Sequence, residues 1–237
     1  MRRDPNAVET LASLEARVIA CERCPELRAY CAEVARVKRR AYRGQDYWGR
    51  PVPAFGDPAA RVLLVGLAPG AHGSNRTGRM FTGDASGVWL YRALFRAGFA
   101  NQADQRNRDD GLVLEDALIT AALRCAPPGN KPEPAQLERC FPYLRAEVEA
   151  LGDLRVVVGL GAIGTRAAAA ALSAAGYDPV ARTPFAHGAE SRYERAGRPR
   201  ATLIASYHPS RQNTNTGVLT EPMLDAIFTR ARSLLTG

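Results

Sequence analysis

Four short apolar runs constrain the fold of this chain more than any other feature of its sequence. They cover Val62–Gly66, Ala117–Ala122, Val156–Leu160 and Thr202–Tyr207. Each of the first three is followed by a loop and a helical pattern, over Gly87–Ala97, Pro134–Leu151 and Ile163–Ala175. Strands that alternate with helices form right-handed crossovers, which gather parallel strands into one sheet covered on both faces. We therefore predict an α/β protein with three layers, α/β/α, around a central four-stranded parallel sheet.

The length of 237 residues fits one domain over residues 1–237 better than two full domains. Residues 7–38 are predicted to be helical with a break at Cys24-Pro25, inside an N-terminal segment of about residues 1–60. No stretch approaches the roughly 18–20 apolar residues of a membrane span, and the first 22 residues lack the apolar core of a secretion signal. We expect a cytoplasmic monomer that does not contact membranes.

The charge balance of 32 basic and 24 acidic side chains, a net +8, suggests an anionic partner, with nucleic acid the first candidate. Charge alone does not decide this, because many basic proteins bind no DNA. The stretch Arg36–Arg50 combines basic and aromatic residues. It either contacts phosphates or forms a solvated face around a packed Trp48, and we favour the second interpretation.

Ligand sites in parallel sheets lie beyond the carboxyl ends of the strands. The loop over residues 66–87 follows the first strand and combines six glycines with His72, Phe81 and Asp84. It is either a flexible surface connection or a functional loop, and its length favours the second. The fourth strand leads to His208, whose position is fixed by Pro209. His208 has either a catalytic role or only a structural one. We expect His208 and Asp84 to face each other across the edge of the sheet.

The third strand leads into Gly159-x-Gly161-x-x-Gly164, a pattern found in dinucleotide-binding proteins. Such a site needs the pattern at the first crossover and an acidic residue after the next strand, where this chain has Ser206-Tyr207-His208. Close packing of a helix on the sheet explains the glycines equally well. A dinucleotide-dependent oxidoreductase therefore remains a weaker alternative.

The chain has five cysteines, and an odd number in a cytoplasmic protein argues against a disulfide framework. Cys21 with Cys24, and Cys125 with Cys140, form two pairs. Thiolates bind zinc or an iron–sulfur cluster, and the spacing does not separate these. Cys31 is either a competing ligand or a small buried apolar residue, and we favour the second.

Several motifs together resemble those of the uracil-DNA glycosylase superfamily. They are Gly66-Leu-Ala-Pro-Gly70, the Phe81/Asp84 segment and His208-Pro209-Ser210. The cysteines and the tract Cys125-Ala-Pro-Pro-Gly-Asn130-Lys131-Pro132 are similar to its iron–sulfur branch, and the glycine loop is similar to that of the family 5, or type b, enzymes. The resemblance runs from Cys21 to about Thr220. It implies a hydrolase that removes uracil from double-stranded DNA in base excision repair, with a [4Fe–4S] cluster on Cys21, Cys24, Cys125 and Cys140.

The resemblance also implies roles for single residues. Phe81 would stack on the flipped base, Asp84 would position water, and His208 would donate to the departing base, with Asn130 as a second polar candidate. The residues expected to bind the substrate are Gly66, Leu67, Ala68, Gly70, His72 and Phe81. Those expected to contact DNA are Arg76, Arg79, Ser210, Arg211 and Gln212. The loop over residues 211–217 would enter the minor groove, and His187 would line the same groove or cap a turn.

The sequence departs from related families at two positions. Leu67 replaces an acidic or amide residue, and Ala121 replaces the asparagine that reads the edge of uracil. Loss of that amide predicts broader base selection, including hypoxanthine and xanthine.

A glycosylase that also cuts the strand needs an amine, and Lys131 is the only lysine expected near the pocket. The carboxylate and water do not need it, so we predict a monofunctional enzyme. We expect the cluster to brace the segment with Asn130 rather than to sense redox state. A non-catalytic iron–sulfur or zinc DNA-binding module is the main alternative, and the pairing of Asp84 with His208 argues against it.

Overall fold

The computed structural model describes residues 5–236, with side chains from residue 11 onward. Its sheet has the strand order β1-β3-β2-β4-β7-β6-β5. The strands are β1 Phe55–Gly56, β2 Val62–Gly66, β3 Ala117–Ala121, β4 Val156–Leu160, β5 Asp178–Ala181, β6 Glu190–Glu194 and β7 Ala201–Ser206. The central strands β3, β2, β4 and β7 are mutually parallel, which confirms the prediction of a four-stranded parallel centre.

Three further strands were not predicted, and all of them pair antiparallel. β1 extends the sheet beyond β3, while β6 and then β5 extend it beyond β7. β1 has only two residues, and the side chains of β5 and β6 are largely exposed or alternate between buried and exposed. Neither pattern gives the continuous apolar run of a central strand. The complete sheet is therefore mixed, with seven strands.

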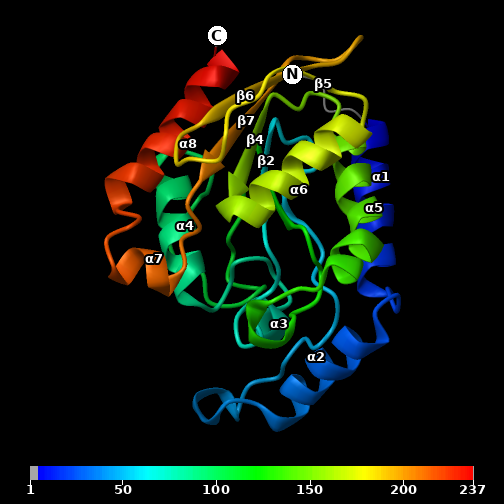
Figure 1. Cartoon of the computed structure of the whole chain (residues 1–237). Helices are drawn as coiled ribbons and strands as arrows, with labels where there is room; N and C mark the ends of the chain where they lie inside the picture. The colour runs from blue at the N-terminus through cyan, green and yellow to red at the C-terminus, as the bar shows by residue number, and fades with distance from the viewer. Residues whose placement is uncertain (1–4, 237) are drawn as a thin grey trace.

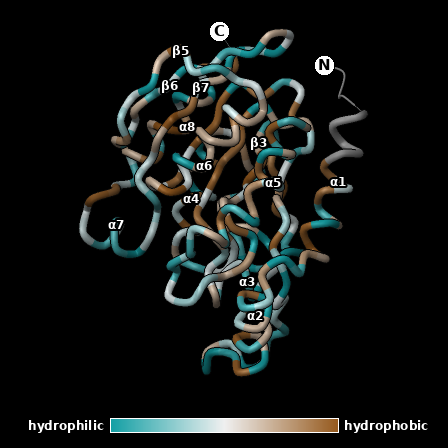
Figure 2. Tube along the Cα trace, turned by 45° about the vertical axis from the view of Figure 1, so that its right-hand side comes forward, coloured by the Kyte–Doolittle hydropathy of each residue, from teal (hydrophilic) through white to brown (hydrophobic). Residues whose placement is uncertain are grey.

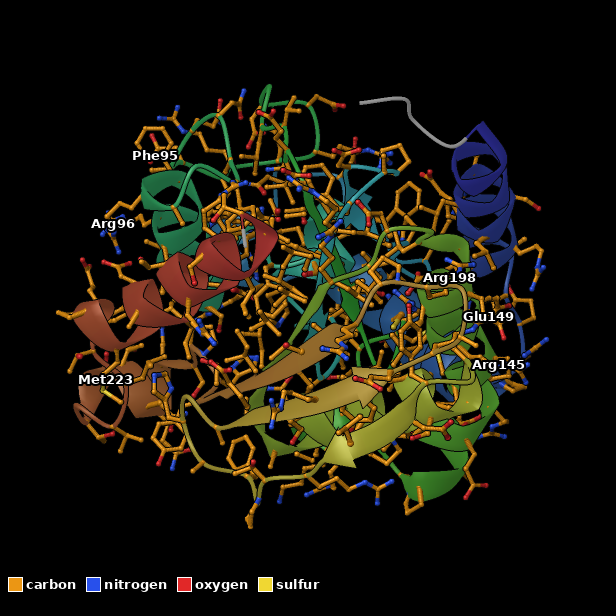
Figure 3. The ribbon with its side chains drawn as sticks, turned by 90° about the horizontal axis from the view of Figure 1, so that it is seen from above. Phe95, Arg96, Arg145, Glu149, Arg198 and Met223 are labelled. Atoms are coloured by element: carbon orange, nitrogen blue, oxygen red, sulfur yellow. The ribbon has the colours of Figure 1, made fainter. Side chains whose placement is uncertain are left out.

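Helices cover both faces of the sheet. They are α1 Pro5–Ile19, α2 Pro25–Val37, α3 Ser74–Thr77, α4 Ala85–Arg96, α5 Pro134–Ala150, α6 Gly161–Ala174, α7 Arg211–Asn215 and α8 Glu221–Thr236, with 3-10 turns at Arg40–Tyr42 and Pro128–Asn130. α4 packs with α8 on one face, and α5 packs with α6 on the other, with α1 outside α5 (Figure 1). The view from above separates Phe95 and Arg96 of α4 from Arg145 and Glu149 of α5 on opposite sides (Figure 3). The three predicted layers are confirmed.

The apolar core lies along the two faces of the sheet. One cluster joins the sheet to α4 and α8, a second joins it to α5 and α6, and a third surrounds the cysteines. The central strands are hydrophobic along their length (Figure 2). Among residues 5–236, no helix has both the length and the apolar character needed to cross a bilayer.

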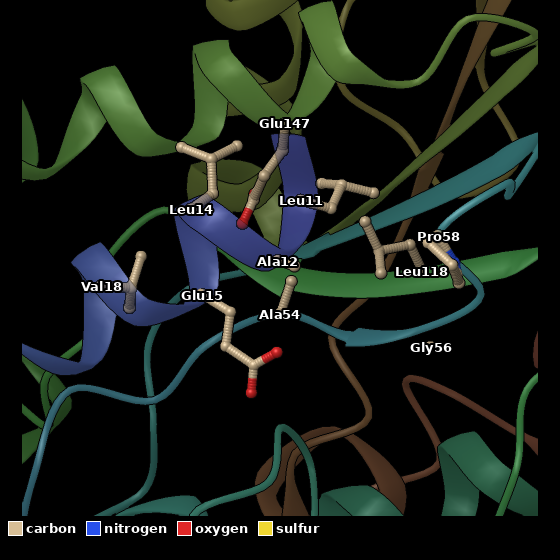
Figure 4. Close-up of a pocket in the computed structure, with 10 residues that line it drawn as sticks. All are labelled: Leu11, Ala12, Leu14, Glu15, Val18, Ala54, Gly56, Pro58, Leu118 and Glu147. Atoms are coloured by element: carbon tan, nitrogen blue, oxygen red, sulfur yellow. The ribbon is translucent and has the colours of Figure 1, made fainter. Parts of the chain in front are cut away.

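A buried ion pair ties α5 to the segment that follows β3. Arg124 and Glu147 are each 2% exposed, and the Arg124 Nη2 atom lies 2.5 Å from Glu147 Oε2. Thr120 donates to the same oxygen at 2.8 Å. On its other side Glu147 borders a cavity of about 220 Å³ between α1 and the segment at Ala54, just before β1 (Figure 4). The pair therefore sits between this cavity and the backbone that leads into Cys125.

Replacing Glu147 with glutamine is expected to lower the free energy of unfolding by about 3–5 kcal/mol, because the charge of Arg124 stays buried without its partner. Urea denaturation measures this loss. Glu149→Gln on the same helix is the matched control, since the Arg145–Glu149 pair is about half exposed (52% and 40%) and such pairs contribute at most about 1 kcal/mol. Equal stability of the two variants would contradict the assignment.

Candidate active site and cysteine cluster

Phe81 and His208 meet at the carboxyl edge of the sheet. Phe81 follows β2 on a left-handed backbone (φ 52°), and His208 follows β7. Their ring centroids are 5.8 Å apart, with 31° between the planes. A Cβ atom at Gly66 would lie 2.8 Å from the Phe81 ring, so only glycine lets the ring rest on the end of β2. The glycine that ends this strand therefore positions an aromatic surface beside the histidine.

Asp84 caps the first turn of α4. Its Oδ1 accepts a hydrogen bond from the Gly87 N–H at 3.1 Å, and its Oδ2 faces the backbone of Gly70 and Gly73. Burial raises the pKa of this carboxyl group, while the N–H groups of Gly87 and Ser86 act in the opposite direction. The side chain keeps a partly exposed edge. A carboxylate with a raised pKa is a better proton acceptor than a fully solvated one.

His208 is enclosed on most sides but keeps a partly exposed edge. Burial lowers its pKa to about 4, so the ring is neutral near pH 7 and carries one N–H donor. Its Cβ atom is 3.2 Å from the position of a Cβ atom at Gly161, and its carbonyl accepts from Asn213 Nδ2 at 2.9 Å. α6 and α7 therefore hold the histidine between them.

Arg211 links the loop after β7 to Asp84. Its positive charge, like that of Arg76, partly offsets the rise that burial causes in the pKa of the Asp84 carboxyl group. The loops after β2 and β7 thus meet at one end of the sheet, where α3 and α7 also lie (Figure 1). The loop after β2, which carries Phe81 and Asp84, therefore meets the loop after β7 through the contact of Phe81 with His208 and the proximity of Asp84 to Arg211.

Two predicted site residues make no side-chain hydrogen bond to Phe81, Asp84 or His208 among the described residues. Asn130 is exposed in a tight turn with φ 56°. His72 lies in the glycine loop, with Nδ1 3.0 Å from the Tyr47 hydroxyl. Tyr47 belongs to the basic-aromatic stretch, whose Trp48 packs over Gly78. That stretch therefore supports the outer side of the glycine loop.

Arg76 and Arg79 are buried within the same loop. Arg76 donates to the carbonyl groups of His72 and Gly83 at 2.8 Å each, and Arg79 forms a bidentate pair with Asp110 at 2.7 and 2.8 Å. Both guanidinium groups are occupied inside the protein. They stabilise the loop, and their burial (8% and 3% exposed) does not favour the predicted DNA contacts.

The segment after His208 is a short helix, α7, rather than the predicted loop. Ser210 caps it, because its Oγ accepts from the Asn213 N–H at 3.4 Å. Arg211 and Gln212 are exposed on its first turn. Leu67 and Ala68 are partly exposed beside the end of β2, while Ala121, which pairs with Gly66 across β2 and β3, is only 1% exposed.

The glycines of the dinucleotide-like pattern serve packing. A Cβ atom at Gly159 would collide with Thr165, and one at Gly164 would collide with the carbonyl of Val65. Thr165 Oγ1 donates to the Gly159 carbonyl at 3.1 Å. These contacts press α6 onto β2 and β4, and the packing interpretation accounts for the pattern.

The cysteines form their own group beside the site. Cys21, Cys24, Cys125 and Cys140 line one small cavity together with Leu27, Leu123, Arg28 and Arg139. Within residues 5–236, no three metal-binding side chains gather closely enough to hold a single ion. A tetrahedral zinc site would need sulfurs about 3.8 Å apart, whereas a [4Fe–4S] cluster holds its thiolates farther apart around a larger core. The four thiols around this small cavity are donors that either zinc or an iron–sulfur cluster can use.

Cys31 is completely buried on α2. Its thiol donates to the Ala126 carbonyl at 3.6 Å, and the side chain packs in the same apolar cluster as Cys125. It does not line the cavity shared by the other four cysteines. This position agrees with a packing role, as favoured from the sequence.

Comparison with known proteins places this chain in a family. The profile of the Uracil DNA glycosylase superfamily matches residues 53–232, and the chain therefore belongs to that superfamily. It is 50% identical over 215 residues to a Type-5 uracil-DNA glycosylase of Thermus thermophilus, covering 91% of this chain and 94% of that protein. It is 46% identical over 226 residues to one of Mycobacterium bovis, covering 95% and 82%. Within the superfamily, the chain belongs to the type-5 uracil-DNA glycosylases.

The type-4 group is a more distant relative. A Type-4 uracil-DNA glycosylase of Pyrobaculum aerophilum is 34% identical over 122 residues, covering 51% of this chain and 54% of that protein. The type-5 relatives thus match nearly the whole chain, and the type-4 relative matches about half.

Proposed function

We propose that this chain is a monofunctional DNA glycosylase that hydrolyses the bond between uracil and deoxyribose in double-stranded DNA, and that it also accepts hypoxanthine and xanthine. The position of the Phe81 ring against His208, with Asp84 on the same loop as Phe81 and near Arg211, supports this proposal most directly. Base removal passes through a sugar cation and a departing base anion. Those species call for a stacking surface, a proton acceptor for water and a donor for the base, which these three side chains can supply.

The proposed reaction begins with a nucleotide that rotates out of the duplex, at a cost of a few kcal/mol. The base stacks on Phe81. The neutral ring of His208, whose pKa is about 4, donates its N–H to a carbonyl oxygen of the departing base and stabilises the developing anion. The backbone N–H groups of residues 67–70 add further donors. Because the histidine is neutral, it donates a hydrogen bond to the base without transferring its proton.

Asp84 is the proposed acceptor for the attacking water. Burial raises the pKa of its carboxyl group, so it takes a proton from water more readily than a solvated aspartate. Its negative charge also stabilises the cationic sugar. One oxygen is fixed by the Gly87 N–H, which orients the carboxylate before the substrate arrives.

Replacing Gly73 with alanine is expected to lower the single-turnover rate of uracil excision by about 10- to 100-fold with little change in thermal stability. The new Cβ atom would collide with the Asp84 carboxylate, and small displacements of catalytic groups have effects of this size. Gly44→Ala is the matched control, because no heavy atom lies within 4 Å of its Cβ position. Identical rates for the two variants would show that Asp84 does not need its present position.

Broad base selection follows from Ala121, which offers no amide to the edge of a base. We expect wild-type protein to excise uracil, hypoxanthine and xanthine from matched duplexes. Ala121→Asn is expected to lower excision of hypoxanthine relative to uracil by about 10-fold or more, because a fixed amide discriminates between hydrogen-bonding edges. Alkali-cleavage assays on a panel of duplexes measure this ratio. Refusal of both purines by a wild-type enzyme that cleaves uracil would overturn the broad-range part of the proposal.

The cofactor we propose is a [4Fe–4S] cluster on Cys21, Cys24, Cys125 and Cys140. The cluster would tie α2 and α5 to the segment after β3, and we assign it this bracing role alone. DNA is proposed to approach over Arg211 and Gln212, with α7 entering the minor groove. Lys131 is exposed in the turn beside Asn130, so we expect no Schiff base with the sugar and no covalent DNA adduct after borohydride treatment.

A further inference from the structure

The loop over residues 182–189 joins β5 to β6 and lies at the same edge of the sheet as His208. The Gly188 N–H donates to the Ala205 carbonyl at 2.8 Å, and the Ala205 N–H donates to the Ala189 carbonyl at 2.9 Å. Thr183 Oγ1 donates to the Glu190 carbonyl at 2.6 Å. These bonds tie both ends of the loop to the sheet, so it is a fixed feature of the edge.

His187 fastens the middle of the loop to two other elements. Its Nδ1 accepts from the Tyr207 N–H, and its Nε2 donates to the Met223 carbonyl, both at 3.2 Å. Met223 lies in the first turn of α8 (Figure 3). Both ring nitrogens are thus engaged in holding the loop against the residue that precedes His208.

Phe185 is the exposed aromatic side chain of this loop. It is 41% exposed, and its ring centroid lies 6.1 Å from that of Tyr207. Tyr207 is backed in turn by His187, with 5.2 Å between ring centroids. An exposed aromatic ring supported by Tyr207, the residue before His208, presents a flat apolar surface that the protein core does not use.

We propose that Phe185, backed by Tyr207, is a stacking platform for the base next to the flipped nucleotide on the damaged strand. This inference rests on the proposed function. The sheet order places β4, β7 and β6 side by side, so a strand that enters the site at Phe81 and His208 continues over the loop after β7 towards Phe185. The exposed side chain of Arg211, which lies near Asp84, is available for a phosphate of this strand. Aromatic rings bind unpaired bases of any sequence by stacking.

The test measures dissociation constants by fluorescence anisotropy with a duplex that carries a non-cleavable abasic analogue at the lesion. Phe185→Ala is expected to weaken binding by about 5- to 100-fold, whereas Phe185→Trp keeps the wild-type value. Val113→Ala is the control, because Val113 is also an exposed apolar side chain (59%) but precedes β3 at the opposite edge. Binding to the analogue does not require excision, so its outcome is separate from that of the proposed function.

A second series identifies the partner of the ring. The same duplex is made with the base on the 5′ or the 3′ side of the lesion removed. If Phe185 stacks on a flanking base, the penalty of Phe185→Ala disappears on one of these two duplexes and persists on the other. Wild-type affinity in Phe185→Ala, or an equal penalty on all three duplexes, would overturn the inference.

Discussion

Replacing His208 with alanine is expected to lower the single-turnover rate of uracil release by about 10²–10³-fold, the effect of removing one donor from a site that stabilises a developing anion. The ring is neutral near pH 7, since burial lowers its pKa to about 4. In the alanine variant the departing base no longer receives the hydrogen bond from the N–H of this ring. Rapid-quench assays with enzyme in excess over a uracil-containing duplex measure the rate.

The same variant should still bind DNA. His208 keeps only a partly exposed edge, and we assign the DNA contacts to other side chains, so affinity for a duplex with an abasic analogue is expected to stay within a few-fold of wild type. A His208→Ala protein that excises uracil at the wild-type rate would remove the histidine from the mechanism. A variant that loses rate and affinity equally would give His208 a binding role instead.

Replacing Cys125 with alanine is expected to release the iron and lower the melting temperature by about 10 °C. A group bound at a thousand times its dissociation constant stabilises the fold by about 4 kcal/mol, and one kcal/mol corresponds to about 2–4 °C in a protein of this size. Cys21 and Cys24 lie just before α2, Cys125 follows β3 and Cys140 lies in α5. Loss of the cluster would therefore free three segments together. Iron analysis and thermal unfolding followed by circular dichroism measure both effects.

Cys31→Ala is the matched control for that experiment. Cys31 is as deeply buried and contacts Cys125, but it does not line the cavity of the other four cysteines. It should keep its full iron content and lose only the small packing contribution of one sulfur atom. Iron retained by Cys125→Ala and lost by Cys31→Ala would exchange the assignments of the two residues.

The centre of the fold was predictable because parallel strands are buried on both faces and appear as continuous apolar runs. Val62–Gly66 and Val156–Leu160 have the same bounds in the structure as in the prediction. β6 was not predictable in this way. Its side chains alternate between buried and exposed, and it pairs with β7, the next strand along the chain. It therefore lacks the continuous apolar run by which the central strands were identified.

The candidate site likewise has residues that the sequence predicts and residues that it does not. Phe81, Asp84 and His208 could be found because they follow the carboxyl ends of recognisable strands. The buried pairing of Arg79 with Asp110, 31 residues later in the chain, could not be found, because an arginine in a glycine loop has the same sequence signature whether it faces solvent or the interior. The exposed position of Phe185 was missed with the hairpin that carries it, although Pro184 and Gly188 mark a turn there.

The measurement that tests the central claim most directly is the identity of the products formed from a duplex with one uracil. Mass spectrometry detects the released base, and gel electrophoresis before and after alkali follows the strand. We predict free uracil, a strand that stays intact until alkali is added, and no covalent adduct with borohydride. If protein with its full content of iron releases no uracil, or cuts the strand without alkali, the account is contradicted.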